Sequence, residues 1–379
     1  MAELEVRKIR KEFGNLVAVR DASLRFDSAR VTCLLGPSGC GKTTLMRMIA
    51  GLEAPTSGDV LFDGKPVTSM SPSARDIGMV FQYPVVYQGL TARQNVALPL
   101  RSLRKLTPAE RSRRVDDALD ILDLRDVADT DVGRLTHALK QKVAVARAIA
   151  RQPHIILMDE PVTNIDATTK SQLKYALRRL TRELHQTIVY VTHDQTEAMT
   201  LADEILLMNE GEIVQRGSPR EVYNRPAHRF GGWFLGNPGM NFVSHRVEKR
   251  AGELTLGRPL FARDTHLQGL DGETDVVVGV RPESLLIART ASQDSVPATI
   301  EHAAIVTGGQ NLLALEVDGV TVKAKVAPGN SYRIGEDVHV TCDPSDVTLF
   351  DTDGARLEVA MVPSTAKRAA PAAREEEPL

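Results

Sequence analysis

Residues 36–44 have the types and the spacing of a phosphate-binding loop. They read Gly-Pro-Ser-Gly-Cys-Gly-Lys-Thr-Thr and fit the pattern G-x-x-x-x-G-K-S/T. In such a loop, backbone N–H groups converge on anionic oxygens in front of the positive end of a helix. Lys42 supplies a mobile positive charge for the β- and γ-phosphates, and the Thr43 hydroxyl is a ligand for Mg²⁺. The predicted phosphate-binding residues are Gly36, Pro37, Ser38, Gly39, Cys40, Gly41, Lys42, Thr43 and Thr44.

An acidic pair follows a second buried run. Residues 155–158 are all apolar, as in a central parallel strand, and Asp159 and Glu160 come at the end of that run. Carboxylates at this end of a strand lie in the crevice where doubly wound sheets bind ligands. Asp159 is predicted to hold Mg²⁺ through water, and Glu160 to orient or deprotonate the attacking water. A chance glycine-rich turn and a chance acidic pair remain the alternatives for each motif taken alone.

A third, largely apolar run, residues 188–192, is followed directly by His193. A lone histidine there is more often structural, but its position after the acidic pair matches a sensor of the γ-phosphate.

The helices and strands that must position these groups follow from the hydrophobic pattern. Residues 31–35 predict a strand entering the loop, and residues 45–50 a helix leaving it. An amphipathic crossover helix is predicted within residues 167–186 by the spacing of Leu173, Leu177, Leu180 and Leu184.

Length and composition limit the class of protein. At about 150 residues per domain, 379 residues predict two or three domains. A net charge of −2 without a basic stripe disfavours nucleic-acid binding. The apolar runs are too short to cross a bilayer, the N-terminus lacks the pattern of a signal peptide, and the three cysteines have no metal-like spacing. We therefore expect a cytoplasmic protein, unless a partner holds it elsewhere.

Together these motifs resemble the ATPase subunits of ATP-binding-cassette transporters. The order along the chain is the same: the loop at 36–43, Gln82, the acidic strand end at 155–160, the turn at 163–166 and His193. The resemblance covers almost the whole chain and is greatest to carbohydrate importers of the maltose and glycerol-phosphate type. It implies an α/β fold, with a P-loop cassette ATPase domain built of a RecA-like core and a helical subdomain. It also implies hydrolysis of ATP with Mg²⁺.

The resemblance assigns further roles. Phe13 corresponds to the ring that stacks on adenine, Asp166 joins the ATP-binding set, and Gln82 touches Mg²⁺ and couples to the membrane subunits. The implied metal set is Thr43, Gln82 and Asp159, and the implied catalytic set is Lys42, Gln82, Glu160 and His193. Residues 83–89 are apolar enough to dock on the membrane subunits, although a buried loop in the helical subdomain is equally compatible.

A second, β-rich domain is predicted after the ATPase. From about residue 242, short β-rich runs such as 276–280, 314–317 and 338–340 alternate with turns and predict a small barrel or sandwich. It resembles the OB-like regulatory and dimerising appendix of these importers, and a ligand-binding module is the alternative. The expected domains are residues 1–235 and 236–363, followed by a disordered tail at 364–379.

One departure concerns the family's signature, Leu-Ser-Gly-Gly-Gln, which clamps ATP bound to the opposite subunit. Here the aligned residues are Leu-Thr-His-Ala-Leu, so Thr136 keeps a hydroxyl whereas His137 and Ala138 replace glycines. A β-carbon obstructs close approach of the backbone to phosphate. Lys140 and Lys142 are expected to restore positive charge at this helix start. An error in this alignment is the alternative, but no Ser-Gly-Gly occurs anywhere between residues 82 and 159.

The weakened signature leads to a hypothesis about partners. We expect an asymmetric heterodimer with a second ATPase subunit, on two membrane-spanning permease subunits at the cytoplasmic face of the inner membrane. A periplasmic solute-binding protein would act indirectly, and the substrate would be a small carbohydrate or polyol, such as glycerol. A regulatory subunit with little hydrolysis and a non-transport cassette ATPase are the alternatives. Cys40, beside Lys42 and a helix N-terminus, is expected to have a lowered thiol pKa and to be protected from alkylation by ATP.

Overall fold

The computed structural model describes residues 3–161, 175, 177–181, 185–250, 253–262, 265–306 and 308–363. The chain divides into two compact units, Met1–Arg225 and Pro226–Leu379. This division falls earlier than the expected boundary at 235/236, because helix α8 (Arg229–Phe234) is bonded to the second unit. The Met240 amide and a buried Arg281 guanidinium both donate to the Gly232 carbonyl at 3.0 Å. No helix in these ranges is long and apolar enough to cross a membrane.

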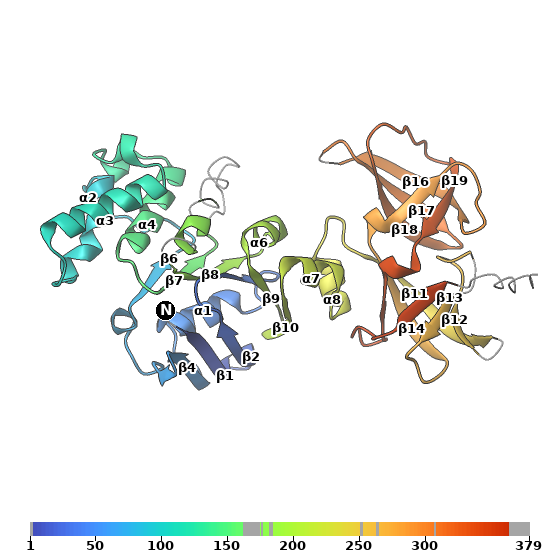
Figure 1. Cartoon of the computed structure of the whole chain (residues 1–379), viewed down its shortest axis with the longest axis horizontal. Coiled ribbons are helices and arrows are strands. Elements are labelled where there is room, and N and C mark those ends of the chain that lie inside the picture. The colour runs from blue at the N-terminus through green and yellow to red at the C-terminus, as the bar shows by residue number, and fades with distance from the viewer. Residues whose placement is uncertain are drawn as a thin grey trace, which may run out of the picture. The chain divides into compact units, whose positions relative to one another are not determined.

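A six-stranded sheet forms the centre of the first unit, in the order β10-β9-β3-β8-β7-β6 (Figure 1). Neighbours from β9 to β6 run parallel, and β10 is antiparallel to β9. Strands β3, β7 and β8 are buried throughout, which explains their continuous apolar runs. The strands are β3 (Val31–Leu35), β6 (Ile77–Val80), β7 (Ile155–Asp159), β8 (Thr187–Thr192), β9 (Glu204–Asn209) and β10 (Glu212–Gly217).

A second, antiparallel sheet covers helix α1 (Lys42–Ala50) and has the order β2-β1-β4-β5. Its strands are β1 (Leu4–Phe13), β2 (Leu16–Phe26), β4 (Ser57–Phe62) and β5 (Lys65–Pro66). One core cluster joins Leu45 and Ile49 of α1 to Leu4 of this sheet and to Leu34 and Val189 of the central sheet. Helix α1 is therefore packed between two sheets, which holds the loop before it in place.

Arg75 closes the C-terminal end of α1. Its guanidinium is buried and donates to the carbonyls of Met48 (2.8 Å), Ile49 (2.7 Å) and Thr68 (2.8 Å). Met48 and Ile49 lie in the last turn of α1, where carbonyls have no intrahelical partner, and a cation there also interacts favourably with the helix dipole. Burial lowers the pKa of Arg75 from its usual value.

Three helices form a separate group in the first unit (Figure 1): α2 (Ala92–Ala97), α3 (Pro108–Ile121) and α4 (His137–Ala150). Each begins after a threonine whose side chain accepts a backbone N–H, as an N-cap should. Helices α6 (Gln195–Leu201) and α7 (Pro219–Asn224) follow the central strands. Of the predicted crossover helix, Leu177 and Leu180 are fully buried, whereas Leu173 and Leu184 lie outside the described residues.

The second unit is β-rich, as predicted, with two antiparallel sheets in the orders β20-β14-β11-β12-β13-β21 and β15-β19-β16-β17-β18. One core cluster contains Val243 and Val278 from the first sheet and Leu313 and Val340 from the second, so the sheets pack face to face. The expected tail at 364–379 lies outside the described residues. The strands are β11 (Asn241–Arg250), β12 (Glu253–Leu256), β13 (Thr265–Gln268), β14 (Thr274–Val280), β15 (Leu285–Ala288), β16 (Val296–Ile305), β17 (Asn311–Val317), β18 (Val320–Val326), β19 (Asp337–Cys342), β20 (Val347–Phe350) and β21 (Ala360–Pro363).

Candidate active site

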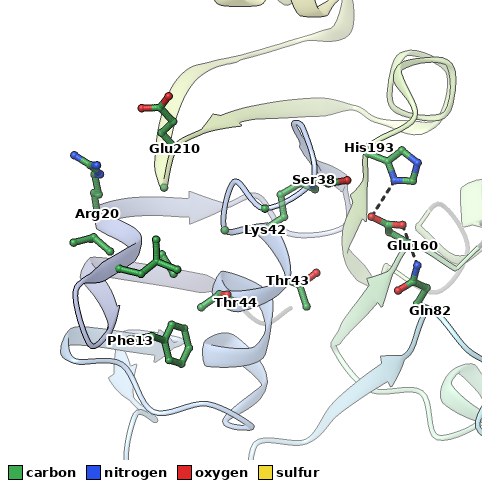
Figure 2. Close-up of a pocket in the computed structure, with 16 residues that line it drawn as sticks. Phe13, Arg20, Ser38, Lys42, Thr43, Thr44, Gln82, Glu160, His193 and Glu210 are labelled. Atoms are coloured by element: carbon green, nitrogen blue, oxygen red, sulfur yellow. Dashed lines mark hydrogen bonds and ion pairs between the residues drawn. The ribbon is translucent and has the colours of Figure 1, made fainter.

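The carboxyl ends of β3, β7 and β8 meet at one edge of the central sheet. Leu35 pairs with Thr192, and Asp159 pairs with Val191. The loop after β3, Glu160 after β7 and His193 after β8 therefore leave the sheet side by side, around a cavity of about 770 Å³ (Figure 2). The predicted residues that line it are Phe13, Ser38, Gly39, Gly41, Lys42, Thr43, Thr44, Gln82, Glu160 and His193. A cavity of this size accommodates a small-molecule ligand such as a nucleotide.

The phosphate-binding loop is held in a conformation that needs its glycines. Gly41 has φ +104°, and a Cβ there would overlap the Ala18 carbonyl oxygen. Lys42 is buried at 5% exposure, and its Nζ donates to the carbonyls of Gly36 and Pro37, each at 2.8 Å. The ammonium group is thus fixed at the loop, where phosphate oxygens can accept hydrogen bonds from it.

Two hard oxygen ligands converge below the loop. The Thr43 hydroxyl donates to Asp159 Oδ1 at 3.1 Å. Burial raises the pKa of the Asp159 carboxyl, and the hydrogen bond from Thr43 opposes this shift. Within the described residues, no group of three His, Cys, Asp or Glu side chains could hold a metal ion by itself. Thr43 and Asp159 supply two oxygen ligands of the kind that proteins use for Mg²⁺, together with water and substrate phosphates.

Glu160 lies between Gln82 and His193 (Figure 2). Its Oε1 is 3.0 Å from His193 Nδ1, and its Oε2 accepts from Gln82 Nε2 at 3.3 Å. The backbone at Glu160 has φ +43°, a left-handed conformation that is uncommon for glutamate and often found at functional sites. A hydrogen bond from its amide to the Val191 carbonyl (3.0 Å) holds this conformation. The carboxylate is therefore aimed into the cavity, where it can accept a proton from water.

Phe13 lines the other end of the cavity, away from His193 (Figure 2). Its ring is 47% exposed, and Lys11 Nζ lies 4.7 Å from the ring centroid. An open aromatic face of this kind can stack on a nucleobase.

Six residues that line this cavity were not expected from the sequence: Leu16, Val17, Ala18, Arg20, Glu210 and Gly211. Strand β2 supplies the first four, and the turn between β9 and β10 supplies the last two. The Arg20 amide donates to the Gly211 carbonyl at 2.8 Å and joins the two segments. The only sequence signal was the hairpin pattern Glu-Gly at 210–211, where both residues have positive φ.

The signature residues Thr136, His137 and Ala138 lie at the start of α4 and do not line this cavity. Thr136 Oγ1 accepts the Leu139 amide at 3.4 Å. Lys140 Nζ is 3.5 Å from the Gly133 carbonyl, and Lys142 is buried at 7% exposure. Asp166 and the rest of the predicted turn at 163–166 lie outside the described residues.

The prediction of a lowered thiol pKa for Cys40 is wrong. The side chain is 4% exposed, and burial raises the pKa of its thiol, against the opposing effect of Lys42. The sequence placed the thiol beside a cation and a helix N-terminus, but it did not reveal that the loop buries the sulfur.

Residues 83–89 are exposed rather than buried in the helical group. Tyr83 is 70% exposed and Tyr87 is 52% exposed, with Val85 between them also on the surface. Of the two interpretations left open by the sequence, the structure favours a segment available to a partner.

Comparison with known proteins agrees with this geometry. The family model described as "ABC transporter" matches residues 19–163, and the model described as "TOBE domain" matches residues 278–350. The sulfoquinovosyl glycerol transport ATP-binding protein SmoE of Agrobacterium fabrum is 37% identical, covering 94% of this chain and 99% of the relative. The sn-glycerol-3-phosphate import ATP-binding protein UgpC 2 of the same organism is 34% identical, covering 97% and 98%. The trehalose/maltose import ATP-binding protein MalK of Thermococcus litoralis is 38% identical, covering 93% and 98%.

Among solved structures, the ATP-binding cassette MJ0796, in a dimeric post-hydrolysis state bound to ADP and Pi, is similar with a TM-score of 0.53. It is 30% identical and covers 57% of this chain and 99% of its own. The relatives match this chain over nearly their whole length, and the chain has the phosphate-binding loop of a nucleotide site. Both findings assign the chain to the same family. This chain belongs to the ABC transporter family as an ATP-binding subunit, and its enzymatic activity is the hydrolysis of ATP.

Proposed function

We propose that this chain powers the import of a small carbohydrate or polyol. The observation that carries the proposal is the convergence of the 36–44 loop, Glu160 and His193 on one cavity, with Asp159 hydrogen-bonded to Thr43 of the loop. The relatives are named for transport of sulfoquinovosyl glycerol, sn-glycerol-3-phosphate and trehalose or maltose, and these names support this class of substrate. Glycerol itself belongs to the same class.

Each group in the cavity has a role in hydrolysis. Lys42 neutralises the β- and γ-phosphates, and Phe13 stacks on the adenine. Thr43, Asp159 and Gln82 would hold Mg²⁺, which supplies charge stabilisation for the transferring phosphoryl group. Glu160 orients and deprotonates the attacking water, and His193, at 3.0 Å, holds the Glu160 carboxylate and binds a γ-phosphate oxygen.

The remaining partners follow from the transporter assignment. Two membrane-spanning permease subunits would bind the exposed segment from Tyr83 to Thr91, and the chain would lie peripherally at the cytoplasmic face of the inner membrane. A periplasmic solute-binding protein would deliver the substrate, with no role for nucleic acid. The β-rich domain would dimerise and regulate, and the tail at 364–379 would follow it.

The signature residues support an asymmetric heterodimer with a second ATPase subunit. In a composite site, the phosphate-binding loop of one subunit faces the α4 start of the other. In a homodimer of this chain, each of the two nucleotides would face His137 and Ala138 instead of the glycines of the signature. Loss of one preorganised donor at a reacting phosphate lowers the rate by roughly 10²–10³. A partner with an intact signature would complete the site built from Lys42, Asp159, Glu160 and His193.

The test is the ATPase rate of the purified chain, alone and in a complex with permease subunits and a second cassette subunit. Weak activity alone and a strong increase in the complex support the asymmetric importer. Full activity as a homodimer refutes the heterodimer, and transport that survives Glu160→Gln supports the regulatory subunit instead.

A further inference from the structure

The ammonium group of Lys11 lies over the ring of Phe13, with Nζ 4.7 Å from the ring centroid. Phe13 lines the nucleotide cavity, whereas Lys11 is outside the set of residues that line it. We propose that Lys11 is a positioning residue for the nucleobase, because it holds the Phe13 ring in the orientation that stacks on adenine. This inference rests on the stacking role given to Phe13 in the proposed function.

The geometry of strand β1 explains why these two side chains meet. Lys11 and Phe13 are two residues apart on this strand, so their side chains leave it on the same face. The residue between them, Glu12, accepts a hydrogen bond from Arg10 Nε at 2.7 Å, and this pair belongs to the opposite face. Lys11 is therefore the cation that the strand itself places beside the ring.

The ammonium group of Lys11 is held by two oxygen acceptors. Its Nζ donates to the Ala54 carbonyl at 2.8 Å and lies 2.6 Å from Glu53 Oε1. The side chain of Lys11 is only 13% exposed. A lysine on a protein surface usually keeps its ammonium group hydrated at the end of a flexible stem. Here the charge has a fixed place, and that place is over the ring.

The acceptors of Lys11 belong to the segment that follows helix α1. The amides of Leu52 and Glu53 both donate to the Arg47 carbonyl in the last turn of α1, at 2.9 Å and 3.3 Å. The other end of α1 carries the phosphate-binding loop. Through Lys11, the ring of Phe13 is therefore fixed relative to the same helix that fixes the phosphate site.

The position of Lys11 also determines which face of the ring is offered to a base. A phenyl ring has two faces, and the ammonium group occupies one of them from outside the cavity. The Phe13 side chain is 47% exposed at the end of its strand, so little else restrains the ring. Binding that must order a free side chain is weakened by the entropy lost. A ring that Lys11 has already ordered avoids this loss.

The first test compares the affinity of the full chain for a non-hydrolysable ATP analogue and for inorganic tripolyphosphate, which has no base. Lys11→Met should weaken binding of the analogue about three- to tenfold, the effect of freeing one side chain that binding must then order. Binding of tripolyphosphate should not change, and Lys11→Arg should retain most of the affinity for the analogue. Lys8→Met, at an exposed lysine of the same strand, is the matched control. Thermal unfolding shows whether each variant is folded.

The second test asks whether Lys11 acts through the ring. When Phe13 is already replaced by alanine, Lys11→Met should cause no further loss of affinity for the analogue. An equal loss with and without the ring, or an equal loss for tripolyphosphate, shows that Lys11 only supports the fold and overturns the proposal.

The same variants separate this inference from the proposed function. If Phe13→Ala weakens binding of the analogue and Lys11→Met does not, the positioning role fails and the stacking role stands. If Phe13→Ala leaves the affinity unchanged, the stacking role itself fails, and the role of Lys11 fails with it.

Discussion

The Glu160 carboxylate and the His193 imidazole lie 3.0 Å apart, on the ends of two neighbouring parallel strands. Glu160 is largely covered, with 15% of its side chain exposed, whereas His193 is 48% exposed. The pairing gives the carboxylate a fixed orientation, and the other ring nitrogen takes no part in it. This geometry is the basis of the first prediction.

Substitution of Glu160 by glutamine should lower kcat for ATP hydrolysis by about 10²–10⁴, because an amide cannot accept the proton of the attacking water. Bound ATP should be retained, since Lys42 and the loop are unchanged. Glu5→Gln, which removes an exposed carboxylate paired with Arg7 at 2.6 Å, serves as the matched control. Steady-state hydrolysis and equilibrium nucleotide binding are the measurements. Near-normal kcat in Glu160→Gln would exclude the role given to this residue.

Substitution of Asp159 by asparagine should stabilise the nucleotide-free protein while it abolishes Mg²⁺-dependent hydrolysis. Burial raises the pKa of Asp159, so this group favours the folded state at low pH, and that contribution is lost as the pH rises through the folded pKa. Removing the charge should therefore raise the free energy of unfolding at neutral pH by on the order of 1 kcal/mol. Denaturant unfolding at pH 4 and pH 7.5 measures this, and the gain should shrink at the lower pH.

Substitution of Phe13 by alanine should weaken nucleotide binding by about 1–3 kcal/mol, the usual value for one aromatic ring stacked on a base. The kcat at saturating ATP should change little, because the ring is remote from Glu160. Phe13→Trp should restore affinity, since indole also presents a flat π face. Titration with a fluorescent ATP analogue provides the comparison, and equal affinity of the alanine and tryptophan variants would argue against stacking.

Substitution of Arg75 by methionine should destabilise the first unit by about 2–4 kcal/mol, because it removes the hydrogen bonds from the guanidinium to the carbonyls of Met48, Ile49 and Thr68. Arg7→Met, at an exposed ion pair, should cost no more than about 1 kcal/mol. Thermal unfolding of both variants measures the difference. If Arg75→Met were as mild as Arg7→Met, the capping role would be wrong.

Cys40 should react slowly with iodoacetamide at pH 7.5 in the native protein, because burial raises its pKa and covers the sulfur. The rate should increase with pH and on unfolding, and ATP should lower it further by occupying the loop. The variant Cys40→Ser identifies the labelled site. Fast labelling of the native thiol at neutral pH would contradict the burial seen here.

The sequence predicted those parts of the site that depend on local spacing. The loop at 36–44 and the apolar runs before Asp159 and His193 each follow from short-range patterns, and the structure brings them to one cavity. Arg75 and Lys11 could not be found in this way. Each acts on a carbonyl far away along the chain, Met48 in one case and Ala54 in the other. Such contacts depend on how the sheets and helices pack, which spacing does not encode.

The burial of Cys40 illustrates the same limit. The local sequence places the thiol beside Lys42 and a helix N-terminus, but it does not show that the loop covers the sulfur. The division between the two units falls before α8 for a related reason. The guanidinium of Arg281, which follows β14, donates to the Gly232 carbonyl of α8, and this long-range contact is not visible in the sequence.

The N-cap of α4 has a consequence for how such subunits diversify. Thr136 satisfies the Leu139 amide through its hydroxyl, so the helix begins securely without the glycines of the family's signature. Folding of the cassette and clamping of a neighbour's nucleotide thus depend on different atoms of the same turn. A duplicated copy can lose its contribution to the opposite site and remain a stable protein, which allows two originally equal subunits to specialise.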